Sequence, residues 1–227
     1  MQLRSQYSIY DGLYGAKGAP LPEDAFAEHL DELIVRHDLG FDVLTAPRDP
    51  SLADYVGARD ADRVFDTVIP RYDVVVIDTP PALNEVVLTA LDRSDLVVVM
   101  ATLDVPSLKN LRVFLDTVTR LKIDDSRLRL VLNKIDSDVG LDVKQAQETF
   151  SDRFVGLISQ SRAIMRAMNM GTVVIESEPR HAVARELLKA VGDVLPEDLA
   201  AEVKAATPNS DRGGLLSRLL SKKGDQG

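Results

Sequence analysis

The chain of 227 residues contains no cysteine. It can therefore form no disulfide, no thiol-based catalytic site and no cysteine-ligated metal centre, which fits a reducing cytoplasm. No apolar run approaches the roughly 18 residues that a membrane-spanning helix needs. The first residues, MQLRSQYSIYDG, also lack the apolar middle section of a secretory signal peptide.

Positive charge is scarce, with 27 Lys and Arg against 36 Asp and Glu and a net charge of −9. An acidic surface disfavours non-specific contact with phosphates, so nucleic acid is not expected as a partner. The apolar fraction of 45% and the charged fraction of 28% are those of an ordinary globular protein. The length suits one α/β domain with a full core.

Short apolar runs alternate along the chain with longer segments of helical spacing. The runs predicted as strands are short and β-branched, which is typical of parallel strands buried on both faces. They are Phe41 to Ala46, Asp73 to Asp78, Leu96 to Ala101, Leu128 to Asn133, Phe154 to Ile158 and Val173 to Glu176. The predicted helices are Leu21 to His37, Ser107 to Leu121, Val143 to Phe150, Ser161 to Met170 and Ala182 to Leu195. This alternation predicts an α/β fold with a doubly wound, mostly parallel sheet and helices on both faces.

A change of composition near Ala206 separates a body, residues 1–205, from a tail, residues 206–227. The stretch TPNSDRGG is a predicted linker. Beyond it, four leucines and three cations between Leu215 and Lys223 fall on opposite sides of a helix. That pattern predicts a short basic amphipathic helix with weak affinity for a membrane surface. A solvated tail is the other interpretation, and the one we favour.

The segment YDVVVIDTPP, from Tyr72 to Pro81, places an aspartate directly after an apolar run. Ligands of open α/β sheets bind at the carboxyl ends of strands, where Asp78 can hold Mg²⁺ through water beside a nucleotide. A loop-capping aspartate is an equally weighted interpretation of this feature alone. Thr79 is followed by Pro80 and Pro81, which stiffen the loop and suit a switch that moves as a unit.

Two further segments end apolar runs with polar residues. Asn133 follows the run Leu128 to Leu132, and its amide can present a donor and an acceptor to a purine edge. An ordinary turn asparagine is the alternative. In DLVVVMATLDVPSLKN, from Asp95 to Asn110, a strand passes into a polar loop and then a helix for which Ser107 is a good N-cap.

In this order and spacing, the three segments resemble the ParA/MinD family of deviant-P-loop ATPases, most closely its CpaE/TadZ-like pilus-assembly branch. GFDVLTAPRDP, from Gly40 to Pro50, resembles the strand and loop before the DTPP strand in that branch. Ser161 to Val191 resembles the C-terminal segment of the family. The resemblance extends over roughly Met1 to Val191.

The resemblance implies ATP and Mg²⁺ as cofactors. Asp78 would be the metal-side carboxylate, acting through water, and Thr79 and Pro80 would belong to the switch loop that senses the γ-phosphate. Asn133 would contact the adenine. The loop Ser159 to Ser161 reads Ser-Gln-Ser where the family usually has a Pro-Glu-Asp-like stretch, so no base contact is assigned there.

The glycine-rich phosphate loop of the family is missing from the sequence. GAKG, from Gly15 to Gly18, lacks the G-x-x-x-x-G-K-[ST] spacing and follows no apolar strand. By the resemblance, the first strand, the phosphate loop and the catalytic aspartate would precede Met1, so no catalytic residue is assigned in this chain. We expect an incomplete gene product, because losing an interior strand exposes unpaired edges. A degenerate pseudo-ATPase, or a strand supplied by a partner, are the alternatives.

The resemblance implies a protein that localises or organises the Flp/Tad pilus-assembly (type II/IV secretion) machinery through ATP-dependent homodimerisation. Its partners would be pilus-assembly or secretion components, in the cytoplasm or at the inner face of the membrane. As written, the chain is expected to bind ATP weakly or not at all and to lack ATPase activity, since the phosphate loop carries most of the charge complementarity. The alternatives are a non-enzymatic scaffold, or a MinD/ParA-type septum-site or chromosome-partitioning protein.

Overall fold

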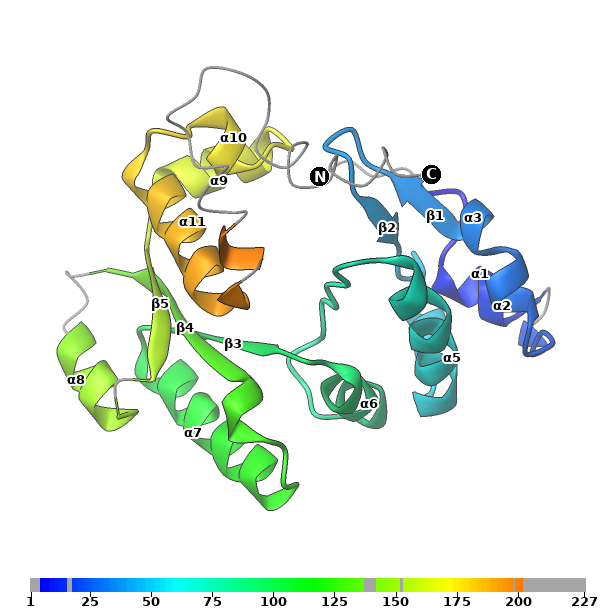
Figure 1. Cartoon of the computed structure of the whole chain (residues 1–227), viewed down its shortest axis with the longest axis horizontal. Coiled ribbons are helices and arrows are strands. Elements are labelled where there is room, and N and C mark those ends of the chain that lie inside the picture. The colour runs from blue at the N-terminus through cyan, green and yellow to red at the C-terminus, as the bar shows by residue number, and fades with distance from the viewer. Residues whose placement is uncertain (1–4, 16–17, 137–141, 152, 198, 202–227) are drawn as a thin grey trace. The chain divides into compact units, whose positions relative to one another are not determined.

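The computed structural model describes residues 5–15, 18–136, 142–151, 153–197 and 199–201. This part of the chain forms two compact units (Figure 1). The N-terminal unit ends at Ser94 and the C-terminal unit begins at Asp95. The predicted boundary at residue 206 and the predicted amphipathic segment Leu215 to Lys223 lie outside the described residues. No helix in the described ranges combines the length and hydropathy needed to cross a bilayer.

The C-terminal unit is built on a parallel sheet in the order β3-β4-β5. The strands are β3 (Val97–Thr102), β4 (Leu128–Ile135) and β5 (Phe154–Ser159). Helices make the connections, as parallel neighbours require. They are α7 (Val105–Arg120) and α8 (Val143–Thr149) between strands, and α9 (Arg162–Asn169), α10 (Val174–Ser177) and α11 (Ala182–Val194) after β5. A 3₁₀ turn, Asp125–Arg127, leads into β4.

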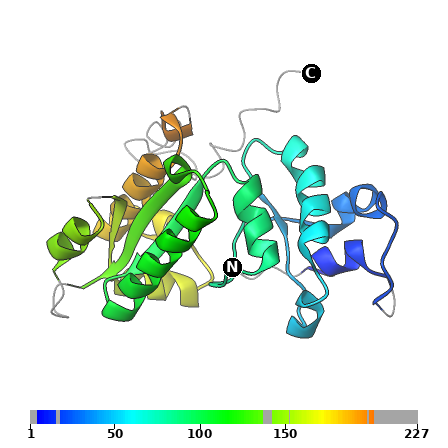
Figure 2. The same cartoon turned by 90° about the horizontal axis from the view of Figure 1, so that it is seen from below.

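Two apolar layers enclose this sheet, because successive strand residues point to opposite faces. Leu130 and Leu132 are at most 1% exposed and pack with Leu111 and Phe150 on the α7 and α8 side. Val131 packs in the opposite layer with residues of α9, α10 and α11. Helices are seen on both sides of the sheet in Figures 1 and 2. The predicted α/β fold with a parallel sheet covered by helices is confirmed.

The N-terminal unit is mainly helical and packs around Leu13, Phe26 and Leu30, each with no exposed surface. Its helices are α1 (Ile9–Leu13), α2 (Ala25–Glu28), α3 (Leu30–Leu33), α4 (Pro50–Ala53), α5 (Ala58–Val68), the 3₁₀ turn Ile69–Arg71 and α6 (Glu85–Arg93). An antiparallel hairpin joins β1 (Ile34–Arg36) to β2 (Asp42–Leu44). Gly40 takes a φ of +87° in the hairpin turn, a conformation that glycine adopts without strain.

The predicted helix Leu21 to His37 is confirmed only as the two short helices α2 and α3, and it is wrong from Ile34 onward. Helix α3 ends at Leu33, and residues Ile34–Arg36 form β1 instead. The β-branched Ile34 and Val35 favour a strand, and they pair with Leu44 and Val43. The apolar spacing of Ile34 and Val35 also continues the helical pattern of the preceding residues. Pairing with β2, which lies further along the chain, therefore decides that this segment is a strand and not a helix.

The predicted strand Val173 to Glu176 is also wrong, because residues Val174–Ser177 form the short helix α10. Val174 is buried against the α9 and α11 layer. A four-residue apolar run is compatible with a buried strand or a buried helical turn, and periodicity cannot separate them.

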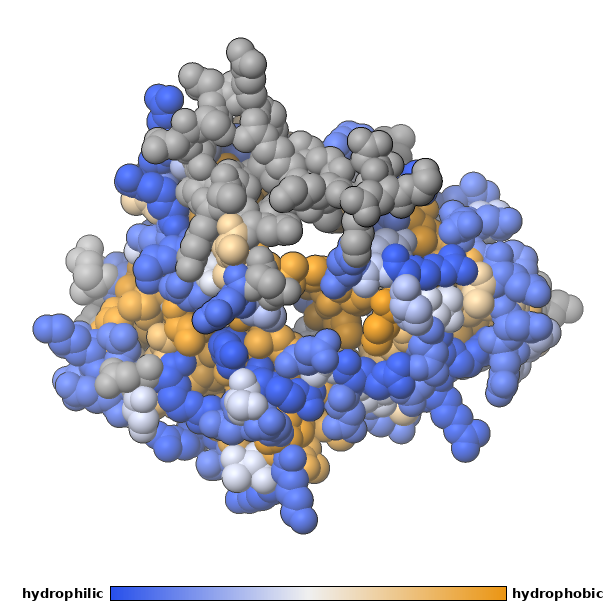
Figure 3. Space-filling view, in the orientation of Figure 1, coloured by the Kyte–Doolittle hydropathy of each residue, from blue (hydrophilic) through white to orange (hydrophobic). Residues whose placement is uncertain are grey.

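The segment Asp73 to Asp78 belongs to no helix or strand of the described residues. Tyr72 and Ile77 pack against the core of the N-terminal unit, whereas Val74 is 51% and Val76 is 88% exposed. The prediction of a buried strand is therefore wrong. On β3, Val98 and Met100, which point to the same face of the sheet as Val131, are likewise 46% and 57% exposed. Figure 3 shows such hydrophobic surface among hydrophilic side chains.

Candidate functional site

A cavity of about 700 Å³ lies at the carboxyl ends of β4 and β5. In open α/β sheets this end of the strands is where ligands bind. The cavity is lined by Ile135, Asp136, Ser159, Gln160, Arg162 and Met165. It therefore combines two apolar side chains with carboxylate, amide, hydroxyl and guanidinium groups.

Hydrogen bonds hold the backbone around this cavity. The Gln160 N–H donates to the Ile135 carbonyl at 2.8 Å, which ties the ends of β4 and β5 together. The Ser159 N–H donates to Oε2 of Glu186 at 2.7 Å, and its hydroxyl donates to Oε1 at 3.1 Å. The Ser161 hydroxyl caps α9 by accepting from the Ala163 N–H at 3.2 Å. The loop Ser159 to Ser161 is thus anchored to β4, α9 and α11.

Asn133 lies two residues before the cavity-lining Ile135, opposite Thr102 of β3. Its side-chain Oδ1 accepts from the Lys134 N–H at 2.8 Å. Lys134 has a φ of +53°, in the left-handed region that residues other than glycine rarely occupy. The hydrogen bond from the Lys134 N–H fixes the orientation of the Asn133 amide, and Nδ2 is then the side-chain group that can donate to a ligand.

The polar loop after β3 is organised by Asp104, which caps α7. Its Oδ1 accepts from the Ser107 N–H at 2.8 Å, and its Oδ2 accepts from the Thr102 hydroxyl. The Thr102 hydrogen bond, followed by the Ser107 backbone bond, lowers the pKa of Asp104 below its ordinary value. The helix therefore begins at Val105, before the predicted N-cap Ser107, whose hydroxyl instead accepts from the Thr102 N–H at 2.9 Å.

Asp78, Thr79 and Pro80 lie in the N-terminal unit and are all exposed. The Pro80 carbonyl accepts from the Ala82 N–H at 2.8 Å, which bends the chain after the prolines. The structure brings Asn133 beside Thr102, whereas it describes Asp78 only within its own unit.

The described residues contain no group of three or more His, Asp or Glu side chains able to hold a metal ion. A single carboxylate suffices for Mg²⁺ only when water and phosphate oxygens supply most of its ligands. The residues present fit a base contact and a water-mediated metal contact, but they do not fit a self-sufficient triphosphate site. No hydrolytic step is therefore derived for this chain.

Sequence reasoning missed Glu186. It lies in α11, 27 residues after the serine that it binds, and no local pattern distinguishes it from a surface glutamate. GAKG is predicted to be a plain loop; its two inner residues lie outside the described residues, and the Gly18 N–H donates to the Gly15 carbonyl at 3.1 Å.

Comparisons with known proteins agree with this architecture. Residues 49–130 match a family described as an AAA domain. A ParA family protein of Mycoplasma genitalium is 23% identical over 184 residues, covering 73% of this chain and 68% of that protein. The cell division protein PomZ of Myxococcus xanthus is 26% identical over 152 residues, covering 63% of this chain and 48% of PomZ.

Solved structures share the fold. A ParA family ATPase from Chlorobium tepidum has a TM-score of 0.66 at 16% identity, covering 81% of this chain and 80% of its own. The cell division ATPase MinD of Pyrococcus furiosus has a TM-score of 0.68 at 16% identity, covering 86% and 77%. MinD of Pyrococcus horikoshii, complexed with Mg-ADP, has a TM-score of 0.63 at 16% identity, covering 83% and 79%. The chain therefore has the α/β fold of the ParA/MinD P-loop NTPases.

Proposed function

We propose that this chain acts as a ParA/MinD-type, nucleotide-responsive positioning protein. The observation that carries the proposal is the cavity of about 700 Å³ at the carboxyl ends of β4 and β5, whose lining residue Ile135 follows Asn133 by two positions on β4. This is the edge at which open α/β sheets bind ligands, and the fold is that of ParA and MinD ATPases.

In this proposal, residues 1–205 form the nucleotide-binding body. Nδ2 of Asn133 donates to the adenine, and the anchored loop Ser159 to Ser161 limits the space beside the base. Asp78 supports Mg²⁺ through water, with Thr79 and Pro80 in the responding loop. A bound Mg²⁺ would neutralise part of the triphosphate charge. The exposure of Asp78 leaves its carboxylate accessible to a hydrated ion.

We propose that this chain acts by binding rather than by hydrolysis. Its sequence contains no G-x-x-x-x-G-K-[ST] spacing, so the backbone cradle that usually holds the β- and γ-phosphates is not among its motifs. A non-enzymatic scaffold that positions other proteins is consistent with this sequence.

The finer role that we propose is organisation of pilus-assembly or secretion machinery in the cytoplasm, at the inner face of the membrane. The resemblance of Gly40 to Pro50 and of the DTPP segment to the CpaE/TadZ-like branch supports it. Placement of the cell-division site or of DNA is the second candidate, favoured by the similarity to PomZ and MinD.

Isothermal titration with Mg·ADP tests the nucleotide site. We expect weak binding, reduced about 3- to 10-fold by Asn133→Ala, the loss of one hydrogen bond. Asp78→Asn should weaken the Mg²⁺ dependence, whereas Asp54→Asn, which changes another exposed aspartate of the same unit, should have no effect. Equal affinities in all variants would contradict the assigned residues. Phosphate release from ATP by the purified chain would contradict the binding-only role.

Affinity capture tests the cellular role. We expect the tagged chain to capture a secretion ATPase from its own cells and to form foci where pili assemble. Enrichment of cell-division proteins, with foci at midcell, would instead support the second candidate.

A further inference from the structure

A second cavity, of about 880 Å³, lies entirely within the N-terminal unit. Four of the five tyrosines of the chain line it: Tyr7, Tyr10, Tyr14 and Tyr55. They come from α1, its flanking residues and the turn after α4, so the cavity collects aromatic side chains from segments about forty residues apart. Nothing in the proposed nucleotide site uses these residues.

The tyrosine rings form an ordered group. Tyr10 and Tyr14 are stacked, with centroids 5.0 Å apart and an interplanar angle of 19°. Tyr55 meets both of them edge-on, with centroids 6.0 Å from Tyr10 and 6.3 Å from Tyr14. Tyr10 is 8% exposed and Tyr55 is 57% exposed, so the group runs from the core to the surface.

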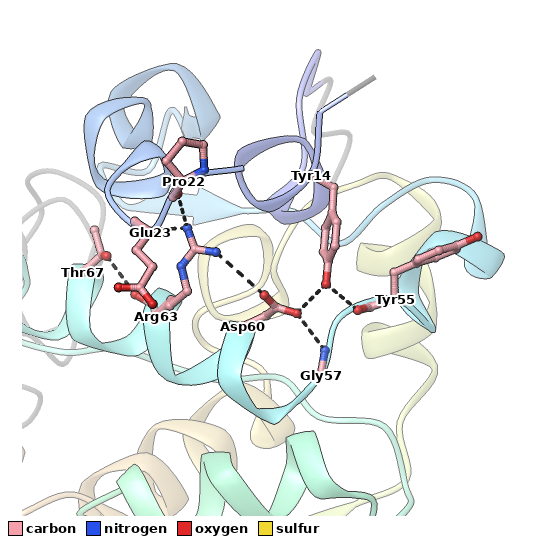
Figure 4. A network of polar contacts seen from close by, with 8 residues as sticks. All are labelled: Tyr14, Pro22, Glu23, Tyr55, Gly57, Asp60, Arg63 and Thr67. Carbon is pink, nitrogen blue, oxygen red and sulfur yellow. Dashed lines mark hydrogen bonds and ion pairs between the residues drawn. The ribbon is translucent and has the colours of Figure 1, made fainter. Parts of the chain in front are cut away.

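A polar network holds Tyr14 in place (Figure 4). The Tyr14 hydroxyl shares its single proton between the Tyr55 carbonyl at 2.8 Å and Oδ2 of Asp60 at 2.7 Å. Arg63 lies 4.0 Å from Asp60 and donates to the carbonyls of Pro22 and Glu23 at 2.7 and 3.0 Å. This arginine is therefore engaged within the structure, and the ring positions are set before any ligand arrives.

The charged groups in the described lining of the cavity are acidic. Asp11, Glu28 and Glu32 contribute to its wall, and all three are exposed. The described residues of the lining include no lysine and no arginine. His29, the histidine of the described lining, places Nδ1 2.8 Å from the Ala25 carbonyl. The cavity thus joins aromatic faces to an excess of negative charge.

Both features attract the same kind of ligand. The faces of tyrosine rings are electrostatically negative and bind ammonium or guanidinium groups, and carboxylates add a direct ionic attraction. A purely structural aromatic cluster would leave little open space, whereas this volume lies within the roughly 300–1,000 Å³ of small-ligand pockets.

We propose that the tyrosine cavity of the N-terminal unit binds an organic cation, the guanidinium or ammonium group of an arginine or lysine side chain in a basic peptide. The aliphatic stem packs along the rings, and the charged head reaches Glu28 and Glu32. The site is independent of the nucleotide and gives the acidic body a specific contact for a basic segment.

Tyrosine fluorescence measures this binding directly, because the chain contains no tryptophan and four of its five tyrosines line the cavity. The probe is N-acetyl-arginine amide, and its neutral isostere N-acetyl-citrulline amide is the ligand control. We expect a saturable change with arginine and none with citrulline. Equal responses to the two, or no saturable response to arginine, would overturn the proposal.

Substitutions assign the binding to the cavity. The double variant Glu28→Gln/Glu32→Gln should bind arginine about 3- to 30-fold more weakly, and Tyr55→Leu about 3-fold more weakly. Glu23→Gln removes one carboxylate charge, half the change of the double variant, on a residue outside the lining and should leave the affinity unchanged. If Tyr55→Leu fails to fold, the arginine affinity of the double variant still tests the site, because Glu28 and Glu32 are exposed and their replacement does not disturb the core. Equal losses in Glu23→Gln and in the double variant would contradict a defined site.

The source of the cation is tested in the full chain. Replacing Arg218, Lys222 and Lys223 with glutamine removes the basic groups of the tail. Tighter binding of arginine by this variant would show that the tail itself competes for the cavity. Unchanged affinity would exclude the tail as the occupant, so that the proposed basic segment would have to come from another chain.

Discussion

The hydroxyl of Tyr14 donates to Oδ2 of Asp60 at 2.7 Å, across 46 residues of sequence. The same carboxylate oxygen accepts from the Gly57 N–H at 3.1 Å, at the start of α5. One aspartate therefore caps a helix and also anchors the residue that ends α1. This contact joins the two segments that carry the tyrosine cavity.

Replacing Tyr14 with phenylalanine should lower the free energy of unfolding by about 1–2 kcal/mol, since it removes a hydrogen bond to a partly buried carboxylate. Urea denaturation measures the change. Tyr7→Phe is the control: Tyr7 is 41% exposed, and its loss should cost no more than about 0.5 kcal/mol. Equal costs for the two variants would show that the Asp60 contact contributes little.

The ionisation of Tyr14 and Tyr72 should lower the free energy of unfolding at alkaline pH, relative to neutral pH. The hydrogen bond to Asp60 raises the pKa of Tyr14 to about 12, and burial, with Asp42, raises the pKa of Tyr72 to about 12. Unfolded tyrosine ionises near pH 10.0, so the unfolded chain loses protons first as pH rises. Stability is then fully present below about pH 10 and is lost as pH approaches 12.

Absorbance of tyrosinate against pH measures this effect. We expect two of the five tyrosines to titrate late in the folded protein, and one late group to disappear in Tyr14→Phe and the other in Tyr72→Phe. Unfolding by urea should become easier over the same pH range. Simultaneous titration of all five near pH 10 would contradict the raised pKa values.

Glu186 should stabilise the C-terminal unit more than a surface carboxylate does. Glu186→Ala removes two hydrogen bonds to Ser159 and should cost about 1–3 kcal/mol. Asp193→Asn, on the same helix, breaks an exposed ion pair with Lys189 and should cost less than about 0.5 kcal/mol. Denaturation midpoints of the two variants compare these costs. A larger loss in Asp193→Asn would contradict the anchoring role of Glu186.

Gly156 has no room for a side chain. An added Cβ would lie 2.9 Å from Cβ of Ala190 and 3.2 Å from Cγ2 of Val131. Gly156→Ala should therefore cost about 1–3 kcal/mol by overpacking between β5 and α11. Ala190→Gly removes the opposing methyl, so the double variant should be less destabilised than the sum of the single changes. Strict additivity of the two costs would show that the contact relaxes freely.

Much of the C-terminal unit could be predicted because its signals are local. The apolar runs that became β3, β4 and β5 and the periodic segments that became α7, α8, α9 and α11 carry their own patterns. A capping side chain can still move the start of a helix away from its predicted position. Asp104 caps α7, which therefore begins at Val105, before the predicted N-cap Ser107. The roles of Asp78, Thr79, Pro80 and Asn133 in nucleotide binding stay predictions, since the amino acid types show what they can contact but not what approaches them.

Composition was enough to establish the acidic charge and the lack of thiol chemistry, and hydrophobic periodicity between neighbouring residues was enough to predict the fold class. Long-range packing, in contrast, made Ile34–Arg36 a strand and Val174–Ser177 a helix, and left Val76 exposed. It alone also brought Tyr14 to Asp60 and Ser159 to Glu186. Those outcomes depend on contacts between segments far apart in the chain, and the free energy of such contacts is not encoded in any local pattern.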